Sequence, residues 1–299
     1  MSVPQNKILV VRGGAIGDFI LTLPVLAALR GQFPNASLEL LGYPHIAQLA
    51  RAGKLVDAVH SIDARPMAGF FARRGQLNPP LADFFASFAV IVSYLYDPDR
   101  IFQENVARIS KAQFFAGPHR PDERADVHAT QVFLEPLKRL AIFDADPVPH
   151  LKLPAADRQP VIALHPGSGS EKKNWSEANW RELIQKLSGS RLLLVGGEAE
   201  EGRLERLAEA APCELAHSLP LAELAARLST CSLFIGHDSG ISHLAAAVGT
   251  PTVVLWGDTA EAVWRPLGER VTLIKSLAHI SVETVHNVVT SPAAPRQML

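Results

Sequence analysis

The sequence predicts an α/β protein of two Rossmann-like domains, each built on a parallel sheet with helices on both faces. Short runs that are apolar throughout alternate along the 299-residue chain with stretches of helical period. Continuously apolar strands are typical of parallel sheets buried on both faces, and the intervening helices supply the crossovers that parallel strands require. A proline-rich stretch at residues 143–160 separates two such series. We therefore expect domains at residues 1–150 and 151–299, with a last helix that is free to pack back on the first domain.

Compact apolar runs predict the individual strands. The helix after the first run is expected to begin near Leu23, because Pro24 is tolerated in the first turn of a helix. The expected strands are residues 7–11, a run that starts at Ser37, and residues 90–93, 161–164, 192–195, 233–235 and 252–255.

The composition favours a globular protein without a general affinity for nucleic acid. Apolar residues make up 47% of the chain, which excludes a disordered protein, and the formal net charge is -1. Because there is no overall basic field, any anion-binding site must be local. The two cysteines favour free thiols in a reducing cytosol, and we find neither a signal peptide nor an apolar stretch long enough to cross a membrane. We expect a cytoplasmic protein.

The first glycine-rich loop, RGGAIGD at residues 12–18, follows a predicted strand and precedes a helix. Glycines there permit a tight turn and a close approach of the backbone to a ligand. The loop matches neither the dinucleotide fingerprint nor a Walker A motif. Its informative residue is Asp18, a carboxylate at a helix start that is either an N-terminal cap or a general base.

The second loop, at residues 165–175, contains the run GSGSEKKNW. Its glycine amides and the hydroxyls of Ser168 and Ser170 suit a phosphate or diphosphate, and Lys172 and Lys173 add positive charge. The alternative is a solvated polar turn with two surface lysines.

The third loop follows the strand that ends at Gly236, where the sequence HDSG turns into a helix. The first amides of that helix can hold an anion, and Asp238 projects at the end of the strand in reach of sugar hydroxyls. A metal site made by His237, Asp238 and His243 lacks further ligands, and His243 is more simply a helix residue hydrogen-bonded inside the fold. We expect no metal.

A fourth loop places Glu198 after two glycines at the end of a buried strand. A carboxylate at that point can accept hydrogen bonds from both hydroxyls of a ribose. The alternative is an acid in the first turn of a helix, and Glu200 and Glu201 compete for either role.

Taken together, these segments resemble glycosyltransferase family 9, the ADP-heptose:lipopolysaccharide heptosyltransferases and their relatives. The resemblance is carried by RGGAIGDFILTLPVLAALR, HPGSGSEKKNW, LVGGEAEE and FIGHDSGISHLAAAVGTPTVVLWG. It implies a GT-B fold, in which two Rossmann-like domains face each other across a cleft. The acceptor then binds mostly to the first domain, and the nucleotide-sugar donor mostly to the second.

The resemblance also implies roles for single residues. Asp18 takes the place of the catalytic base, and Lys173 that of the lysine beside the donor phosphates. Glu198 takes the place of the acid that binds the ribose, and Asp238 that of the acid that holds the transferred sugar. The implied donor site comprises Ser168, Gly169, Glu198, Asp238, Ser239, Gly240, Ser242 and His243.

The acceptor side carries less signal. Scattered arginines can meet phosphates or carboxylates of a glycolipid or glycan acceptor, although each taken singly is more simply a solvated charge. Residues 70–80 mix basic, aromatic and proline residues and are a candidate mobile acceptor loop. Contact with the inner face of the membrane would be peripheral, through the acceptor. The candidate acceptor residues are Arg12, Gly14, Arg73 and Arg74.

The implied reaction is an inverting transfer of a heptose or related sugar that needs neither a metal nor another cofactor. Two acidic D-x-D pairs, Asp97 with Asp99 and Asp144 with Asp146, are expected to be surface turns instead of metal sites. An epimerase or hydrolase acting on a nucleotide sugar, and a non-catalytic nucleotide-sugar binder, remain as alternatives.

Overall fold

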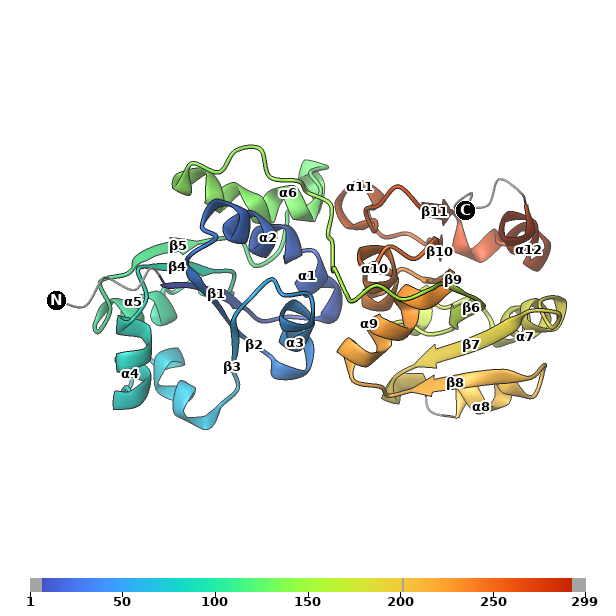
Figure 1. Cartoon of the computed structure of the whole chain (residues 1–299), viewed down its shortest axis with the longest axis horizontal. Coiled ribbons are helices and arrows are strands. Elements are labelled where there is room, and N and C mark those ends of the chain that lie inside the picture. Colours follow the sequence, from blue (N-terminus) through green and yellow to red (C-terminus); the bar gives the residue numbers. More distant parts are fainter. Residues whose placement is uncertain (1–6, 201, 292–299) are drawn as a thin grey trace. The chain divides into compact units, whose positions relative to one another are not determined.

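The computed structural model describes residues 7–200 and 202–291, and it divides into two compact units between Pro147 and Val148. Each unit holds one sheet in which every pair of neighbouring strands is parallel, and helices flank each sheet (Figure 1). The predicted α/β class with two parallel sheets is confirmed.

The sheet of the first unit has the strand order β3-β2-β1-β4-β5, which is that of the doubly wound dinucleotide-binding fold. The chain reverses direction across the sheet between β1 and β4, so the loops that follow these two strands diverge and leave room for a ligand. The strands are β1 Lys7–Arg12, β2 Ser37–Gly42, β3 Ala58–Ser61, β4 Val90–Ser93 and β5 Gln113–Ala116. The α-helices are α1 Ile16–Ile20, α2 Leu23–Gln32, α3 Pro44–Ala52, α4 Pro79–Ala86, α5 Ile101–Ala107 and α6 Ala129–Leu134, with 3-10 turns at Arg65–Phe71, Glu123–Ala125 and Glu135–Leu140.

The sheet of the second unit has the order β11-β10-β9-β6-β7-β8, with the corresponding reversal between β6 and β9. The carboxyl ends of β6 and β9 are therefore neighbours, and their loops are the second and third candidate loops of the sequence. The strands are β6 Gln159–His165, β7 Arg191–Gly196, β8 Cys213–His217, β9 Cys231–His237, β10 Thr252–Leu255 and β11 Val271–Ile274. The α-helices are α7 Glu177–Lys186, α8 Arg203–Ala208, α9 Leu221–Thr230, α10 Gly240–Ala247, α11 Glu261–Trp264 and α12 Val282–Thr290, with 3-10 turns at Glu171–Lys173, Glu198–Glu200 and Leu277–His279.

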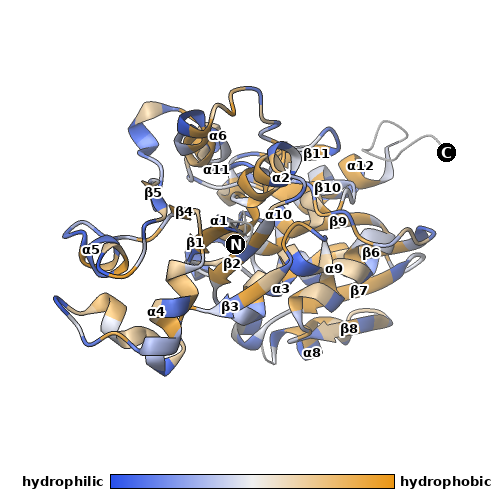
Figure 2. Ribbon diagram, turned by 60° about the vertical axis from the view of Figure 1, so that its left-hand side comes forward, coloured by the Kyte–Doolittle hydropathy of each residue, from blue (hydrophilic) through white to orange (hydrophobic). Residues whose placement is uncertain are grey.

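The apolar residues collect on the strands and on the inner faces of the helices (Figure 2). In the first unit, phenylalanines from the 3-10 turn, from α4 and the residues just after it, and from α5 form part of the core: Phe70, Phe85, Phe88 and Phe102. Phe85 packs edge to face on Phe102 and lies tilted against Phe70. In the second unit α12 packs against α7, and Val285 and Val289 join the core that surrounds Trp180. Among the described residues, no helix has the length and apolar character needed to cross a membrane.

Every predicted strand is present, with bounds that agree to within two residues. The helix expected near Leu23 begins at Leu23, with Pro24 in its first turn. The helix start expected at Asp18 is a short separate helix, α1, which the sequence analysis did not distinguish from the helix at Leu23. Strands β3, β5, β8 and β11 were also not predicted, and they are the outer strands of the two sheets.

Asn105 fastens the segment that was expected to be a mobile acceptor loop. Its side-chain amide donates to the carbonyl groups of Gly69, Phe70 and Ala72 at 3.3, 3.0 and 2.8 Å. Its carbonyl oxygen accepts a hydrogen bond from Arg108 at 2.9 Å, which fixes the orientation of the amide. The segment is thus tied to α5 through buried polar groups.

We expect Asn105→Ala to lower the free energy of unfolding of the first unit by about 3 kcal/mol, because buried carbonyl groups lose their donors. Circular dichroism during urea unfolding measures this, since all four tryptophans lie in the second unit. The exposed helix residue Gln131 gives the control: Gln131→Ala should change stability by less than about 0.5 kcal/mol. An equal stability of the two variants would contradict the assigned role.

Candidate functional site

Asp18 lies in the first turn of α1, at the carboxyl end of β1, and its side chain is 31% exposed. One carboxylate oxygen, Oδ2, accepts the N–H of Ala15 at 3.3 Å. Gly14 has a φ of 100°, and a Cβ at that position would lie 3.1 Å from the same oxygen. The glycine thus lets the loop close around the carboxylate. Asp18 caps the loop, and its side chain is still partly exposed to solvent. The structure is therefore compatible with both interpretations drawn from the sequence, an N-terminal cap and a general base.

Arg12 holds this loop in place from the interior of the first unit. Its side chain is buried, and its guanidinium donates to the carbonyl of Asp18 at 3.2 Å and to that of His119 at 3.0 Å. The same group stands 4.5 Å from the ring centre of Phe133 and 3.8 Å from the Asp18 carboxylate. Burial lowers the pKa of Arg12, while the Asp18 carboxylate acts in the opposite direction. The structure therefore gives Arg12, expected beside the acceptor, the role of positioning Asp18.

The other candidate acceptor residues differ in their surroundings. Gly14 shapes the Asp18 loop, whereas Arg73 and Arg74 are exposed in the segment after the first 3-10 turn. Arg73 forms an ion pair with Asp99 at 3.2 Å, and Arg74 has a left-handed backbone with a φ of 50°. No described contact joins these two arginines to Asp18.

In the second unit, one ion pair joins the loops after β6 and β9. The Nζ of Lys173 lies 2.6 Å from Oδ2 of Asp238, and Thr259 donates its hydroxyl proton to the same oxygen at 2.6 Å. The side chain of Asp238 is 10% exposed, while that of Lys173 is 42% exposed. Thr259, which follows β10, was missed by the sequence analysis, although it stands two positions after the quoted run that ends in WG. Three strand ends thus meet around one carboxylate.

The loop after β6 is closed by its own side chains. The Ser168 hydroxyl lies 2.8 Å from the carbonyl of Ser170 and 2.8 Å from the side-chain oxygen of Asn174, and it accepts the N–H of Ser170 at 3.3 Å. Next to it, a Cβ on Gly169 would meet nothing within 4 Å. The backbone at Gly169 is therefore open to a ligand, whereas the Ser168 hydroxyl is engaged.

At the start of α10, backbone N–H groups are available to a ligand, whereas the side chains are already engaged or buried. Ser239 is the N-cap, and its hydroxyl accepts the N–H of Ser242 at 3.4 Å. Ser242 and His243 are buried, and the Ser242 hydroxyl donates to the carbonyl of His237. Because the first amides of a helix have no partner within the helix, an anion would meet the N–H groups from Gly240 onward.

His237 braces the loop after β6 from beneath. Its Nε2 accepts the N–H of Trp175 at 2.8 Å, so the ring is unprotonated there and its Nδ1–H donates to the carbonyl of Gly167 at 3.3 Å. Burial lowers the pKa of His237 to about 4. Burial, with His237 nearby, also lowers the pKa of His165 to about 3. Both rings are neutral at pH 7, so neither adds a charge beside Lys173 and Asp238.

The three acids after β7 differ in their surroundings. Glu198 begins the 3-10 turn and is exposed, which leaves its carboxylate available to a ligand. Glu200 is buried and accepts the N–H of Gly197 at 2.8 Å, and a Cβ on Gly167 would overlap its carboxylate. Glu201 lies outside the described residues. Glu200 therefore braces the glycine loops from within the fold.

The D-x-D pairs do not gather further acids. The Asp97 carboxylate accepts the N–H groups of Phe102 and Gln103 at 3.2 and 3.0 Å and so caps α5. Asp144 and Asp146 lie in irregular backbone. Across residues 7–200 and 202–291, no group of three or more His, Cys, Asp or Glu side chains is arranged to hold a metal ion.

Known proteins resemble this chain in sequence. Residues 135–290, just over half of the 299-residue chain, match the family model of glycosyltransferase family 9 (heptosyltransferase). Lipopolysaccharide heptosyltransferase 1 of Salmonella typhimurium is 39% identical over 103 residues, which cover 33% of this chain and only 32% of that protein. Lipopolysaccharide heptosyltransferase 3 of Escherichia coli is 24% identical over 283 residues, which cover 84% of this chain and 83% of that protein.

Solved structures share the fold. The glycosyl transferase family 9 protein from Veillonella parvula has a TM-score of 0.77 at 18% identity and covers 95% of this chain and 96% of its own. Escherichia coli heptosyltransferase WaaC with ADP has a TM-score of 0.76 at 19% identity and covers 95% and 98%. The two parallel-sheet units and these likenesses define a glycosyltransferase of the GT-B fold. More particularly, the chain belongs to glycosyltransferase family 9, as the sequence motifs predicted.

The buried neutral His237 makes the second unit sensitive to acid. Its pKa is about 4 in the folded chain and 6.5 ordinarily, so the unfolded chain binds the proton first. Its contribution to stability is therefore full above pH 6.5 and is lost as the pH falls toward 4, a loss of roughly 3 kcal/mol. In His237→Gln, which cannot titrate, we expect the decline between pH 7 and pH 4 to be smaller by about that amount.

Urea unfolding followed by tryptophan fluorescence measures this effect, because the tryptophans report on the second unit and Trp180 stands 5.4 Å from the His237 ring. The exposed His279 provides the control, and His279→Gln should keep the pH dependence of the unaltered protein. An unchanged slope in His237→Gln would show that His237 is not the titrating group.

Proposed function

We propose that this protein transfers a heptose, or a related sugar, from ADP-heptose to a lipopolysaccharide inner-core or other glycan acceptor, with inversion and without a metal. Membership of glycosyltransferase family 9 supports the reaction class, and the relatives named heptosyltransferases support the sugar. The structure of a neighbour described with ADP supports an adenine nucleotide. The reaction takes place in the cytoplasm, with membrane contact through the acceptor alone.

The observation that carries the proposal is the contact between Lys173 and Asp238. It puts a partly exposed lysine side chain at the end of the strand that leads into α10, and the same loop has open backbone at Gly169. A diphosphate in this place gains one full positive charge and the partial charge of a helix N-terminus. Asp238 then serves as the acceptor of hydroxyl protons from the sugar, and Glu198 does the same for the ribose.

The chemistry follows from these roles. An acceptor hydroxyl gives its proton to Asp18, and its oxygen attacks the anomeric carbon of the donor. The bond from that carbon to the diphosphate oxygen breaks on the opposite side, so the configuration inverts and the nucleoside diphosphate leaves. Lys173 and the amides of α10 stabilise the negative charge that grows on the leaving group, which is the task that a metal performs in other transferases.

We expect Asp18→Asn to lower the turnover number by about 10²- to 10⁴-fold, because the general base is lost while the shape is kept. Binding of ADP should stay within about twofold, as Asp18 does not serve the donor. Turnover is measured as ADP release together with mass spectrometry of the product, with the exposed Asp83→Asn as control.

Loss of ADP binding along with turnover would mark Asp18 as structural instead. ADP-heptose consumed without any acceptor, with the heptose hydrolysed or epimerised, would replace the transferase by an enzyme of the alternative class.

We expect Lys173→Met to weaken ADP binding by about 10- to 100-fold, because a charged hydrogen bond to phosphate is removed. The neighbouring Lys172 is exposed and gives a matched control, so Lys172→Met should leave the affinity within about threefold. Isothermal titration calorimetry with ADP measures both. The reverse order of effects would assign the phosphate contact to Lys172.

A further inference from the structure

The carboxylate of Asp238 is held by only one of its two oxygens. Oδ2 receives both the ammonium of Lys173 and the hydroxyl of Thr259, each at 2.6 Å. Oδ1 takes part in no hydrogen bond or ion pair among the residues that the structure describes. An ionised carboxylate accepts about four hydrogen bonds over its two oxygens, so half of this capacity is unused. The second oxygen is therefore left for a ligand.

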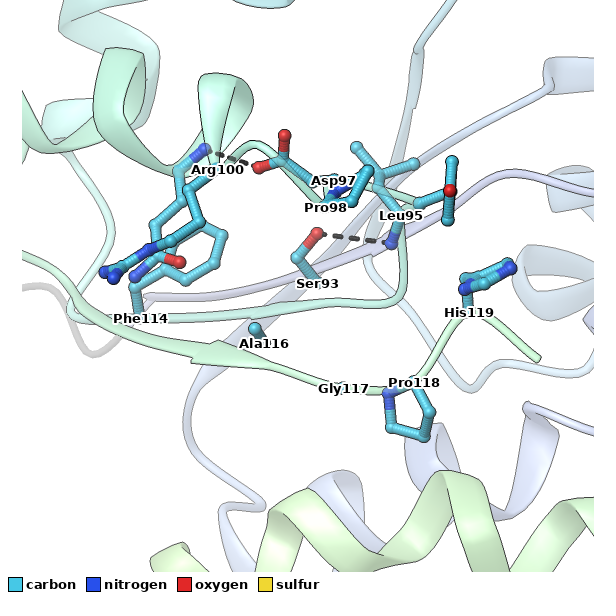
Figure 3. A pocket seen from close by; sticks show the side chains of 12 residues that line it. Ser93, Leu95, Asp97, Pro98, Arg100, Phe114, Ala116, Gly117, Pro118 and His119 are labelled. Atoms are coloured by element: carbon cyan, nitrogen blue, oxygen red, sulfur yellow. Dashed lines mark hydrogen bonds between the residues drawn. The ribbon is translucent and has the colours of Figure 1, made fainter. Parts of the chain in front are cut away.

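Asp97 in the first unit shows the opposite arrangement. It also follows a parallel strand, β4, and it is one of the residues that line a pocket there (Figure 3). Its Oδ1 accepts the N–H of Phe102 at 3.2 Å, and its Oδ2 accepts the N–H of Gln103 at 3.0 Å. Both oxygens of Asp97 are thus used by the fold, to cap α5. The one-sided attachment of Asp238 is not a general property of acids that follow strands in this chain.

Thr259 is the rigid one of the two donors on Oδ2. Its side chain is short and β-branched, so it has few rotamers. The indole N–H of the buried Trp256 donates to the Thr259 carbonyl at 2.9 Å. The backbone of Trp256 is itself paired, through its N–H with Ile274 at 2.8 Å and through its carbonyl with Leu277 at 3.1 Å. The place of the Thr259 hydroxyl is therefore set by the core around β10 and β11.

Lys173 is the movable donor. Its ammonium group stands on a flexible chain of four carbons, and the side chain is 42% exposed. The diphosphate of a donor attracts this ammonium away from Asp238, because phosphate oxygens carry charge of their own. If Lys173 were the single donor on Oδ2, the carboxylate would then turn freely about its last bond, which has broad torsional preferences. Thr259 keeps Oδ2 in place when Lys173 turns to the phosphate.

We propose that Thr259 is a positioning residue for the donor sugar. It holds Oδ2 of Asp238, so that Oδ1 faces the site and accepts a hydroxyl of the transferred sugar. The inference rests on the proposed function, in which Asp238 binds the sugar and Lys173 meets the diphosphate. Since Thr259 acts through Asp238, its hydroxyl matters for a nucleotide that carries the sugar and not for the nucleotide alone.

Isothermal titration calorimetry of the whole protein with ADP and with ADP-heptose, in the absence of acceptor, tests the proposal. Thr259→Val keeps the branched shape and removes the hydroxyl. It should weaken binding of ADP-heptose about tenfold, because the sugar loses a fixed acceptor, and change binding of ADP by less than about twofold. Thr259→Ser restores a hydroxyl at the same place and should bind ADP-heptose within about threefold of the unaltered protein.

Thr272 gives the matched control. It lies on the outer strand β11, and within the described part of the chain its side chain makes no hydrogen bond. Thr272→Val should leave both affinities unchanged. A second comparison uses Asp238→Ala as the background. Adding Thr259→Val to that variant should have no further effect on ADP-heptose, because the carboxylate through which Thr259 acts is already absent.

An equal loss of ADP and ADP-heptose in Thr259→Val would show that the residue supports the loop as a whole and would overturn the proposal. Unchanged binding of ADP-heptose in that variant would overturn it too, as would a Thr259→Ser variant as weak as Thr259→Val. In each of these cases the binding of ADP by the unaltered protein leaves the proposed function standing. If the unaltered protein bound neither nucleotide, the proposed function and this inference would both be defeated.

Discussion

The buried guanidinium of Arg12 is the constraint on which the first unit depends. Removing a charged group from water costs several kcal/mol, and here carbonyl groups from three separate segments and the face of Phe133 offset that cost. Because each carbonyl belongs to a different loop, the two terminal nitrogens of the guanidinium find these acceptors only when all three segments take their places, while its buried Nε has no partner among the described residues. The position of Asp18 is therefore set by the burial of Arg12 as well as by the glycine loop that closes around its carboxylate.

In the second unit, the neutral imidazole ring of His237 holds the site loops in place. His237 ends β9 and joins the backbone on both sides of the loop after β6, at Trp175 and Gly167. The next residue, Asp238, contacts Lys173 and Thr259 beside a histidine ring that carries no charge. Lys173 and Asp238 thus lie in loops that the neutral His237 holds in place. The phosphate charge of a donor is then met by Lys173 and by the first amides of α10.

The inner strands of both sheets were predictable and the outer ones were not, for a physical reason. Strands such as β1 and β9 are buried on both faces, so their sequences are apolar at nearly every position. The outer strands β3, β5, β8 and β11 are only partly covered, and sequences such as AVHS and CELAH carry polar residues that resemble those of loops. Their place in the sheets is fixed by pairing with an inner neighbour, which no local pattern reveals.

The candidate site divides in the same way. Residues held by local geometry, such as Asp18 after its glycine loop and Ser239 as the cap of α10, could be found from the sequence because motif and role lie within a few positions. The role of Arg12 could not, since its partners stand 82 and 107 positions away, and an arginine beside a glycine loop looks like a ligand-binding residue until those carbonyls are seen.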